Sequence, residues 1–317
     1  MRQRQSRGLK MRIALIVFLL FLCLGFPMAA EKSALAIPSL DRTALSVATG
    51  EAGAFLSGLD SLGKNPAGLC GTTREWNATH RQMPLETSVS GTAIRLPLAS
   101  FHSTLAVSYT VLRSANLEGR TAAGDRVGDF QQEDQMMGVH LARPFVVGGY
   151  EIEAGASVKG IHSRIDRYSG TGLAVDLGLR HHFKEIPLTV GVSELNMGEG
   201  PKLMNERSAL PTSFGISASY AVAPSVFLFG GASYQSGQDI LTFSAGGEYQ
   251  IGHLFALRGN YAAGSGAEGN SGVGQLVGGF GVILGKCRLD YAFQPAGEEL
   301  AQAGAPATQH ATLTLDF

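Results

Sequence analysis

The residues most suggestive of chemistry lie between Gly58 and Asn65. Gly58, Gly63 and Lys64 have the spacing of a phosphate-binding loop, G-x-x-x-x-G-K. Such a loop continues with a serine or threonine whose hydroxyl binds Mg²⁺, but this chain has Asn65, and no strand pattern precedes the motif. Ser61 and Lys64 also fit the S-x-x-K start of a β-lactamase site, but no S-D-N or K-T-G follows. We therefore expect neither nucleotide binding nor acyl transfer here.

The histidines form no evident catalytic or metal-binding group. His181 and His182 are adjacent on a predicted strand, so they point to opposite faces and cannot chelate one metal ion together. Four others lie singly on or directly beside predicted strands, without an evident partner: His80, His102, His140 and His162. The sequence therefore predicts no enzymatic activity, no metal and no cofactor.

Composition narrows the fold class. Of 317 residues, 16% are charged, against about 25% in a typical soluble domain, and 42 are glycine, roughly twice the ordinary share. A hydrophobic content of 44% is too high for a disordered chain, and a net charge of −1 without a basic stripe argues against nucleic-acid binding. No long apolar run follows residue 26, which excludes a helical membrane protein. An all-β protein remains.

Residues 1–30 predict a signal peptide for export. Their five basic residues precede an apolar run, 13–26, which is shorter than the roughly 18 residues that a spanning helix needs. Cleavage is expected after Ala30, with Ala36 as the alternative. Cys23 follows the bulky Leu22, which argues against lipid attachment. Export to an oxidising compartment would permit a disulfide between Cys70 and Cys287, although two small apolar side chains are the simpler interpretation.

From residue 75 onward, apolar residues recur with a period of two. In residues 213–220, one face carries Phe214, Ile216, Ala218 and Tyr220, and small residues alternate with them. Fourteen strands are predicted, at 75–82, 87–98, 102–112, 132–143, 150–161, 171–183, 187–196, 211–221, 225–235, 240–250, 253–263, 272–284, 286–294 and 307–317. They are about 8 to 13 residues long, which brackets the 9–11 or so that cross a membrane at a tilt.

The connections between these strands favour a membrane barrel over a soluble sandwich. Short connections at 99–101, 184–186, 251–252 and Gly285 alternate with long polar ones, which are 113–131, 197–210, 264–271 and 295–306. Short turns on one rim and long loops on the other are typical of an outer-membrane β-barrel. A sandwich would also alternate, with its two apolar faces packed together. We therefore predict a transmembrane antiparallel β-barrel of about 14 strands over 75–317.

Two features of the strands concern the lumen and the chain end. Eight charged residues fall on inward positions: Lys159, Asp176, Arg180, Glu248, Arg258, Arg288, Asp290 and Asp316. Four acids and four bases should pair with one another rather than form a selectivity ring of one sign. Phe317 ends the last alternating strand, as in many bacterial barrels that the assembly machinery recognises, so we predict that it is the assembly signal.

Residues 31–74, the hatch segment, do not alternate. Ala, Gly and Leu mix over 44–62 as in short helices and turns, and the apolar content predicts that the segment packs inside the barrel. Asn65, Pro66, Ala67 and Gly68 are the candidate gating residues. Pro66 biases Asn65 toward an extended conformation, Gly68 permits a turn that other residues make less easily, and Asn65 can hydrogen-bond nearby backbone.

Several short motifs carry a resemblance to a known family. They are the Asn65–Leu69 run N-P-A-G-L, Gly155–Gly160, Ala174–Gly178, Leu210–Thr212, Gly247–Tyr249, Leu257–Tyr261, Leu289–Phe293 and the closing strand. With these the sequence resembles the FadL-like outer-membrane proteins, most closely their PorV/PorQ branch. The resemblance implies a 14-stranded barrel with an N-terminal hatch in the outer membrane of a Gram-negative type cell. FadL moves long-chain fatty acids inward through a lateral opening, whereas PorV handles secreted cargo in type IX secretion.

Two functions therefore remain open. In the first, the barrel transports a hydrophobic small molecule across the outer membrane, with outer-membrane lipid and the barrel-assembly machinery as its other partners. In the second, it is a PorV-like component of protein secretion that receives or shuttles secreted cargo. Lateral transport needs a break in the hydrogen-bond ladder of the wall and an apolar pocket behind it. The hatch segment is either a plug that seals the lumen or a gate. Less favoured are a structural or adhesive barrel and a barrel hydrolase.

Overall fold

The computed structural model describes residues 37–84, 86–115, 117–121, 123–236, 239–265, 274–296 and 306–317. The predicted signal peptide, 1–30, lies outside the described residues. So do residues 31–36 of the hatch segment and most of the predicted loops 264–271 and 295–306.

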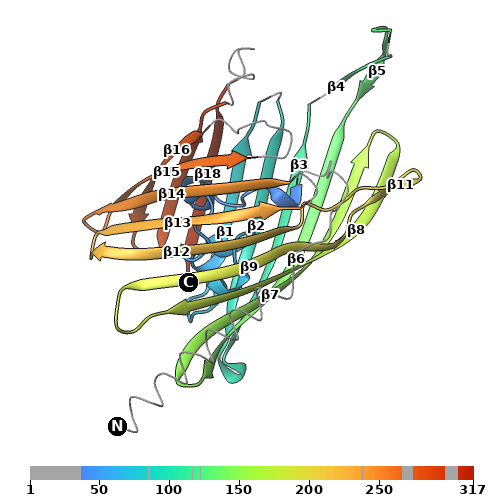
Figure 1. Cartoon of the computed structure of the whole chain (residues 1–317). Coiled ribbons are helices and arrows are strands. Elements are labelled where there is room, and N and C mark those ends of the chain that lie inside the picture. Colours follow the sequence, from blue (N-terminus) through green and yellow to red (C-terminus); the bar gives the residue numbers. More distant parts are fainter. Residues whose placement is uncertain are drawn as a thin grey trace.

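Fourteen antiparallel strands close into a barrel (Figure 1). They are β1 (Glu75–Gln82), β2 (Ser88–Leu98), β3 (Ser103–Arg113), β6 (Gln132–Val147), β7 (Tyr150–Ile165), β8 (Tyr168–His182), β9 (Leu188–Glu199), β12 (Ser213–Ala223), β13 (Val226–Gln235), β14 (Ile240–Ile251), β15 (Phe255–Ser265), β16 (Gln275–Leu284), β17 (Cys287–Gln294) and β18 (Thr308–Asp316). Each strand pairs with its neighbour in the chain, and β1 closes the ring against β18, so the sheet has no free edge. The predicted barrel is confirmed.

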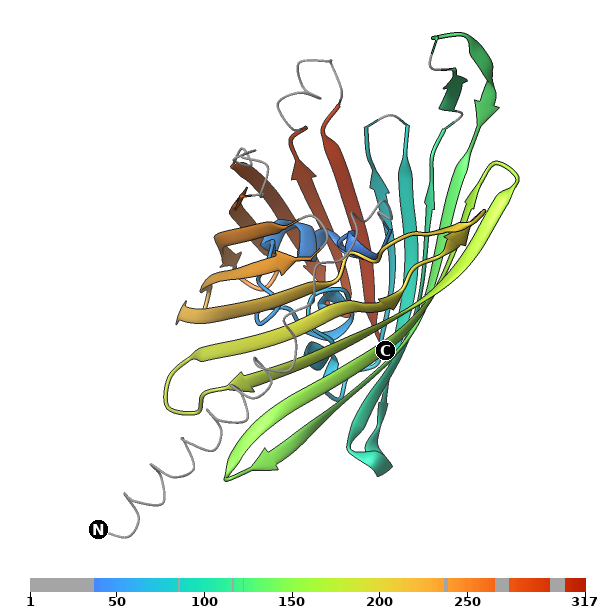
Figure 2. The same ribbon diagram turned by 45° about the vertical axis from the view of Figure 1, so that its right-hand side comes forward.

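The two rims of the barrel differ as the loop lengths predicted. Gly252 and Gly285 adopt positive φ, 61° and 63°, in the short turns of one rim, where the last strand also ends. At the other rim, two predicted loops contain hairpins of their own, β4 (Leu117–Arg120) with β5 (Arg126–Phe130), and β10 (Lys202–Leu203) with β11 (Glu206–Arg207). Figure 2 shows the β4–β5 hairpin standing beyond the barrel on this long-loop rim.

Strands β6, β7 and β8 are longer than predicted. The sequence placed their ends at 143, 161 and 171, where polar residues interrupt the apolar face, but pairing continues to Val147, Ile165 and Tyr168. A polar outward residue does not end a strand, because a strand that has left the lipid can continue its hydrogen-bond ladder in water.

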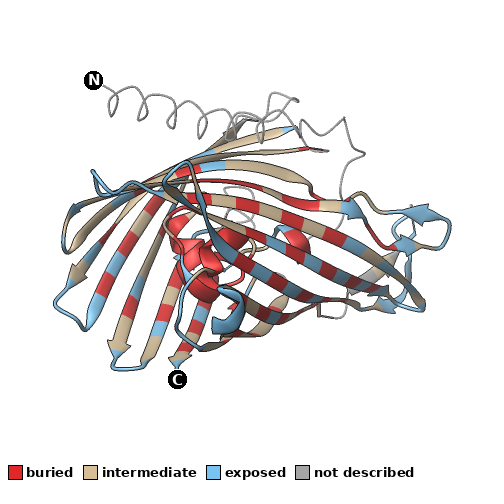
Figure 3. Ribbon diagram, turned by 90° about the horizontal axis from the view of Figure 1, so that it is seen from below, coloured by how far each residue is buried: buried red, intermediate tan, exposed pale blue. Residues whose placement is uncertain are grey.

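The outer face of the barrel is apolar and exposed. Figure 3 shows buried and exposed residues alternating along the strands, and the exposed set includes Val139, Val158, Leu173, Leu257 and Leu289, each between 47% and 54% exposed. A soluble protein rarely leaves such a continuous apolar band uncovered, whereas a membrane barrel turns it toward lipid. Among the described residues, every helix is too short to cross a membrane.

This facing can be tested at Val158. Val158 lies opposite Val139 and Val175 on the neighbouring strands and is 51% exposed. We expect Val158→Arg to lower the free energy of unfolding in phospholipid vesicles by about 2–4 kcal/mol, because the guanidinium would enter hydrocarbon. Urea titration of the folded fraction measures this, with Val158→Leu as the control. A loss no greater than that of Val158→Leu would show that the band does not face lipid.

The hatch segment lies inside the barrel, where the strands surround its helices (Figures 2 and 3). Its elements are η1 (Ile37–Ser39), α2 (Ala44–Thr49), η2 (Gly58–Ser61) and η3 (Pro66–Leu69). Thr43 caps the N-terminus of α2, where its hydroxyl accepts a hydrogen bond from the Ser46 amide, and Gly50 caps the C-terminus with a φ of 60°. All six of its residues are buried, because the helix is enclosed on every side.

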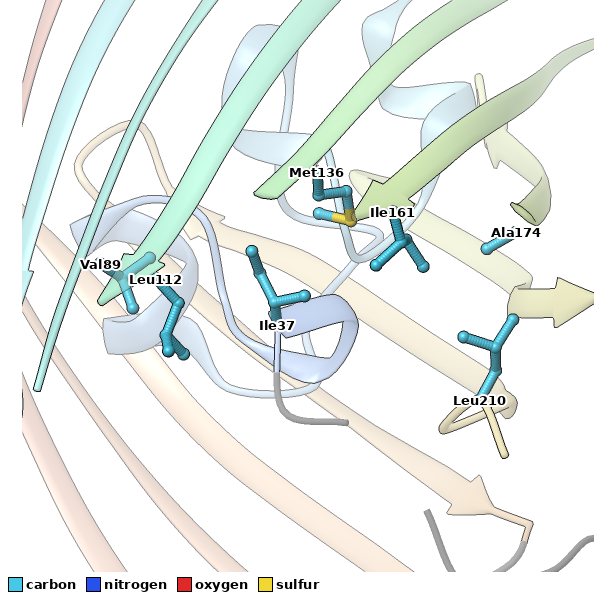
Figure 4. Packing of buried hydrophobic residues seen from close by; sticks show 7 residues of the cluster. All are labelled: Ile37, Val89, Leu112, Met136, Ile161, Ala174 and Leu210. Carbon is cyan, nitrogen blue, oxygen red and sulfur yellow. The ribbon is translucent and has the colours of Figure 1, made fainter. Parts of the chain in front are cut away.

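The hatch segment crosses the lumen from the long-loop rim to the short-turn rim. Ile37 is fully buried in a cluster near the long-loop ends of the strands (Figure 4). The cluster contains Val89, Leu112, Met136, Ile161, Ala174 and Leu210. η2 and η3 lie deeper and contact β1, β2, β6, β7 and β8, after which the chain enters the wall at Glu75. The lumen is therefore a packed core in its own right.

Candidate functional site

The candidate gating residues form a short helix that is tied to the wall. Asn65 caps η3, and its Oδ1 accepts a hydrogen bond of 3.0 Å from the Ala67 amide. Its Nδ2 donates to the backbone oxygens of Leu179 in β8, at 3.0 Å, and Val192 in β9, at 3.2 Å. Pro66 occupies the first turn, where its missing N–H costs nothing. The Asn65 amide thus binds its own turn and two wall strands at once.

Three glycines of the wall make room for this turn. A Cβ at Gly155 in β7 would overlap the backbone of Pro66 and Ala67, and a Cβ at Gly178 in β8 or Gly191 in β9 would lie closer than 3.0 Å to the Asn65 amide group. Two of these glycines belong to the motifs that carry the family resemblance. Their role is therefore to let the hatch segment approach the wall closely.

The reason expected for Gly68 is wrong. Gly68 is absent from the residues with positive φ, so its turn does not require the left-handed conformation. A Cβ there would instead lie 2.8 Å from the backbone oxygen of Leu56 and would overlap the Ser61 side chain. Glycine is required by close packing inside the hatch segment.

Two of the eight lumen charges, Lys159 and Asp176, pair with each other and also contact Asn196 in β9. Lys159 Nζ lies 2.6 Å from Asp176 Oδ1, and both side chains are at most 5% exposed. Asp176 Oδ1 also accepts a hydrogen bond of 2.8 Å from the backbone amide of Asn196, and Lys159 donates to the Asn196 side chain. The pair therefore holds a backbone group of the wall as well as neutralising itself.

A second group of charges joins three strands and the hatch segment. Arg258 contacts Glu248 at 2.5 Å and Asp290 at 2.6 Å. Arg288 contacts the other oxygen of Asp290 at 2.6 Å and also Asp60 in η2. The alternating signs let each charge be met by an opposite one, which a buried ion requires.

Three acidic partners escaped the sequence analysis. Arg180 pairs with Glu153 at 2.5 Å and donates to the backbone oxygen of Leu56. Arg95 pairs with Glu75 at 2.5 Å, and Glu75 accepts from the Leu59 amide at 2.9 Å. Asp60, the third acid, meets Arg288. Glu75 and Glu153 fall on inward positions of the alternating pattern, which was the available signal.

Asp316 and Phe317 lie at the short-turn end of β18. Asp316 is exposed there, apart from the ion pairs described above. The Phe317 amide donates to the Arg74 backbone oxygen at 3.1 Å, and its ring is 54% exposed. The last residue is thus hydrogen-bonded to the chain just before β1. Its role as an assembly signal stays a prediction.

The two described cysteines are free and do not form a disulfide. Cys70 follows η3 inside the barrel, whereas Cys287 begins β17 opposite Leu284 and Leu315. Burial, with a further contribution from Glu153, raises the pKa of the Cys70 thiol to about 12. The thiol is therefore protonated near neutral pH and reacts poorly.

His140 has partners that the sequence did not reveal. Its Nε2 lies 2.9 Å from Ser108 Oγ and its Nδ1 lies 2.8 Å from Ser157 Oγ. A catalytic histidine uses one ring nitrogen for the nucleophile and the other for an orienting carboxylate. Here hydroxyls occupy both nitrogens and the ring is 3% exposed, so the trio joins β3, β6 and β7 rather than forming a hydrolase site.

Strand β9 is distorted by a bulge at Asn196. Leu177 of β8 lies opposite Glu194, but Val175 lies opposite Met197, so β9 contains one extra residue. The chain accommodates the extra residue at Asn196, whose φ of 60° is in the left-handed region. Its Nδ2 donates to the backbone oxygens of Pro38 in η1 and Pro211 in the loop before β12, both at 3.2 Å. The bulge thus joins the wall to η1.

The pairing of β9 with β12 stops at this bulge. Leu195 and Ser213 are the last paired residues of the two strands. Residues 197–199 of β9 pair with β8, while the Asn196 backbone oxygen accepts a hydrogen bond of 2.9 Å from the Thr212 hydroxyl before β12. By contrast, β2, β3 and β6 pair without a register shift along their shared length. We call the region around Leu195, Asn196 and Ser213 the seam.

A cavity of about 80 Å³ lies behind the seam, between the hatch segment and strands β9, β12 and β13. Its lining includes Ser193, Leu195 and Asn196 of β9, together with Glu51 and Lys64 of the hatch segment. Most of the lining is polar or glycine. This cavity differs from the apolar pocket that lateral transport was expected to need.

Comparison with known proteins identifies the fold. No protein-family model and no curated protein matches the sequence. The solved structures of the monoaromatic hydrocarbon channels TodX (a ΔS2S3 mutant) and CymD match with TM-scores of 0.63 and 0.62 at 11% and 12% identity. The matches cover 86% and 90% of this chain and 97% and 99% of those chains.

A third similar structure is that of a FadL homologue from Pseudomonas aeruginosa, with a TM-score of 0.57 at 9% identity. That match covers 90% of this chain and 99% of that one. The resemblance to FadL is thus confirmed at the level of the fold, while the assignment to the PorV/PorQ branch stays a prediction. This chain has the fold of the FadL-like barrels.

Proposed function

We propose that this chain is an outer-membrane channel through which a small, largely hydrophobic molecule passes by way of the seam. The observation that carries the proposal is the end of the β9–β12 ladder beside a lumen that the hatch segment fills. A packed lumen offers no straight aqueous path. An apolar solute cannot cross an intact hydrogen-bonded wall, so the place where pairing stops is its natural exit. The fold is that of channels named for monoaromatic hydrocarbons, which supports the same class of solute.

The hatch segment would act as the gate. Its η3 end is anchored, because Asn65 binds two wall strands and Arg180 binds Leu56. Its η1 end meets the bulge itself, through the bond from Asn196 to Pro38. Movement of η1 would therefore be coupled to the seam, while the turn of Asn65, Pro66, Ala67 and Gly68 serves as the fixed end. We further propose that Phe317 is recognised by the barrel-assembly machinery.

Closing the seam tests this function. Leu195 and Ser213 are paired, so Leu195→Cys with Ser213→Cys, in a chain whose native cysteines are replaced by alanine, places two thiols across the last rung. We expect the oxidised variant to take up a hydrophobic dye several-fold more slowly than the reduced one, in cells whose outer membrane contains the folded barrel. The cysteine-free chain is the control for the reductant. Equal uptake in the two redox states would contradict a route through the seam.

The same cells distinguish the channel from the alternative function in protein secretion. A PorV-like role in secretion predicts that the barrel captures a secreted protein and that dye uptake equals that of cells without it. Affinity purification of the barrel from the outer membrane measures the first property. Uptake without a captured protein supports the channel, and the reverse result supports the secretion component.

A further inference from the structure

The cavity behind the seam contains polar groups that the protein leaves unused. Three serines and a glutamine line it from β9, β12 and β13: Ser193, Ser213, Ser233 and Gln235. Within the described part of the chain, none of these four side chains has a hydrogen-bond partner. Other serines of the same wall are used, since Ser217 and Ser244 accept hydrogen bonds of 2.8 Å from the Ala54 and Glu51 amides of the hatch segment.

Polar groups that the protein leaves unused are available to a ligand. A hydroxyl can donate one hydrogen bond and accept two, and a carboxamide can do both as well. Ser193 is only 6% exposed, so it is largely shielded from bulk water. A polar group that enters the cavity would satisfy several of these side chains together. The cavity therefore has the chemistry of a binding site for a hydrogen-bonding group.

The charges around the cavity disfavour an ionic group. Lys64 contacts Asp41 at 2.9 Å and Glu51 at 3.1 Å. Burial alone would lower the pKa of Lys64, but the two carboxylates outweigh burial and raise it, so the lysine keeps its charge. One cation against two anions leaves no free positive charge for a carboxylate ligand. Each carboxylate already contacts Lys64, so a cationic ligand would have to compete with that ion pair.

The size of the cavity and the strands around it limit which ligand can bind. A cavity of about 80 Å³ is smaller than the roughly 150 Å³ site that holds benzene, so it can accept a small head group but not a whole amphiphile. The opposite face of the same strands carries Phe214, Ile216 and Met197, where a tail would meet lipid, and also the Glu194 carboxylate opposite Phe214.

We infer that the molecule handled by this channel is an amphiphile with a small uncharged head, such as a hydroxyl or carboxamide, on an apolar tail. The head binds the four unused side chains behind the seam, and the tail lies toward the lipid face. This inference rests on the proposed channel function and names its substrate class. It separates this chain's substrate from a plain hydrocarbon, which has no head, and from a fatty acid, whose head is an anion.

Saturable binding to the folded barrel in lipid nanodiscs tests the inference. Labelled 1-decanol, decanoate, decylammonium and decane share one tail, and the signal of empty nanodiscs is subtracted. We expect decanol to bind at least tenfold more tightly than the other three. Ser193→Ala with Ser233→Ala should weaken decanol binding about tenfold, since two hydrogen bonds to the head would be lost.

The matched control is Ser219→Ala, which removes a hydroxyl from the same face of β12 outside the cavity lining and should leave decanol binding unchanged. Heat-modifiable migration shows that each variant is folded. Tighter binding of decanoate, decylammonium or decane than of decanol would overturn the inference. So would decanol binding that the double variant does not weaken. Either result would leave the redox-dependent uptake through the seam standing, so the two proposals fail separately.

Discussion

Arg258→Met is expected to lower the free energy of unfolding of the barrel by about 3–5 kcal/mol, because it leaves a buried charge without its partner. Arg258 is 9% exposed and is held by Glu248 on its own hairpin and by Asp290 two strands away. Methionine fills a similar volume but removes the charge. Asp290 would keep Arg288 as a partner, whereas Glu248 would remain buried and, among the described residues, hydrogen-bonded to the neutral Gln250.

Restoring neutrality separates this charge effect from packing. The triple variant Glu248→Gln, Arg258→Met and Asp290→Asn removes all three charges while keeping the side-chain volumes close to native. It should regain most of the stability that Arg258→Met loses, because an uncompensated buried charge costs more than an absent ion pair. Urea titration of folded barrel in phospholipid vesicles measures both variants. A triple variant as unstable as the single one would show that Arg258 acts through its shape.

The sequence predicts the barrel well because the barrel repeats one local pattern, an alternating strand followed by a turn. Each strand carries its own alternation, and each turn lies between two such runs, so no contact between distant residues needs to be known. Strand ends were less certain, as in β7, where the outward residues His162 and Arg164 are polar but the ladder continues to Ile165. Polarity indicates where lipid ends, which is a different boundary from the end of pairing.

The site was harder to predict because it depends on relations between neighbouring elements. Asn196 lies at the end of a predicted strand, and its left-handed φ follows from a mismatch of register with β8 that the sequence of β9 alone does not contain. Glu194 was a partial signal that β9 is irregular here, because its carboxylate lies on the outward face between Leu177 and Phe214. The partners Asp60 and Glu75 could not be matched to Arg288 and Arg95 without knowing how the hatch segment is placed.

The roles of the wall glycines also could not be predicted from the sequence, and they lead to the second prediction. Gly155 and Gly160 both lie on β7, and the sequence does not distinguish their roles. Inside, a Cβ at Gly155 would overlap the backbone of Pro66 and Ala67, whereas a Cβ at Gly160 would meet nothing within 4 Å. Gly155 and Gly160 are five positions apart, so alternation puts them on opposite faces, but only the position of the hatch segment shows that the inner glycine is in contact.

Gly155→Val should therefore displace the turn at Pro66 and Ala67 while the barrel itself stays closed. The overlap is with backbone atoms, which cannot move aside as a flexible side chain could, so the hatch segment must shift as a unit. Because that segment fills the lumen, we expect cells with this variant to become at least tenfold more permeable to small hydrophilic antibiotics. The measurement is the rate of antibiotic entry, at equal amounts of heat-modifiable barrel in the outer membrane.

Gly160→Val adds the same side chain to the same strand on the lipid face, so it should leave permeability unchanged. If the hatch segment is a gate rather than a plug, Gly155→Val should also change the uptake of a hydrophobic dye, because η1 and the turn belong to one chain that spans the lumen. A leak without any change in dye uptake would identify a plug. Normal behaviour toward both solutes in a folded Gly155→Val barrel would show that the turn neither seals the lumen nor controls the seam, and the function would then have to lie in the wall alone.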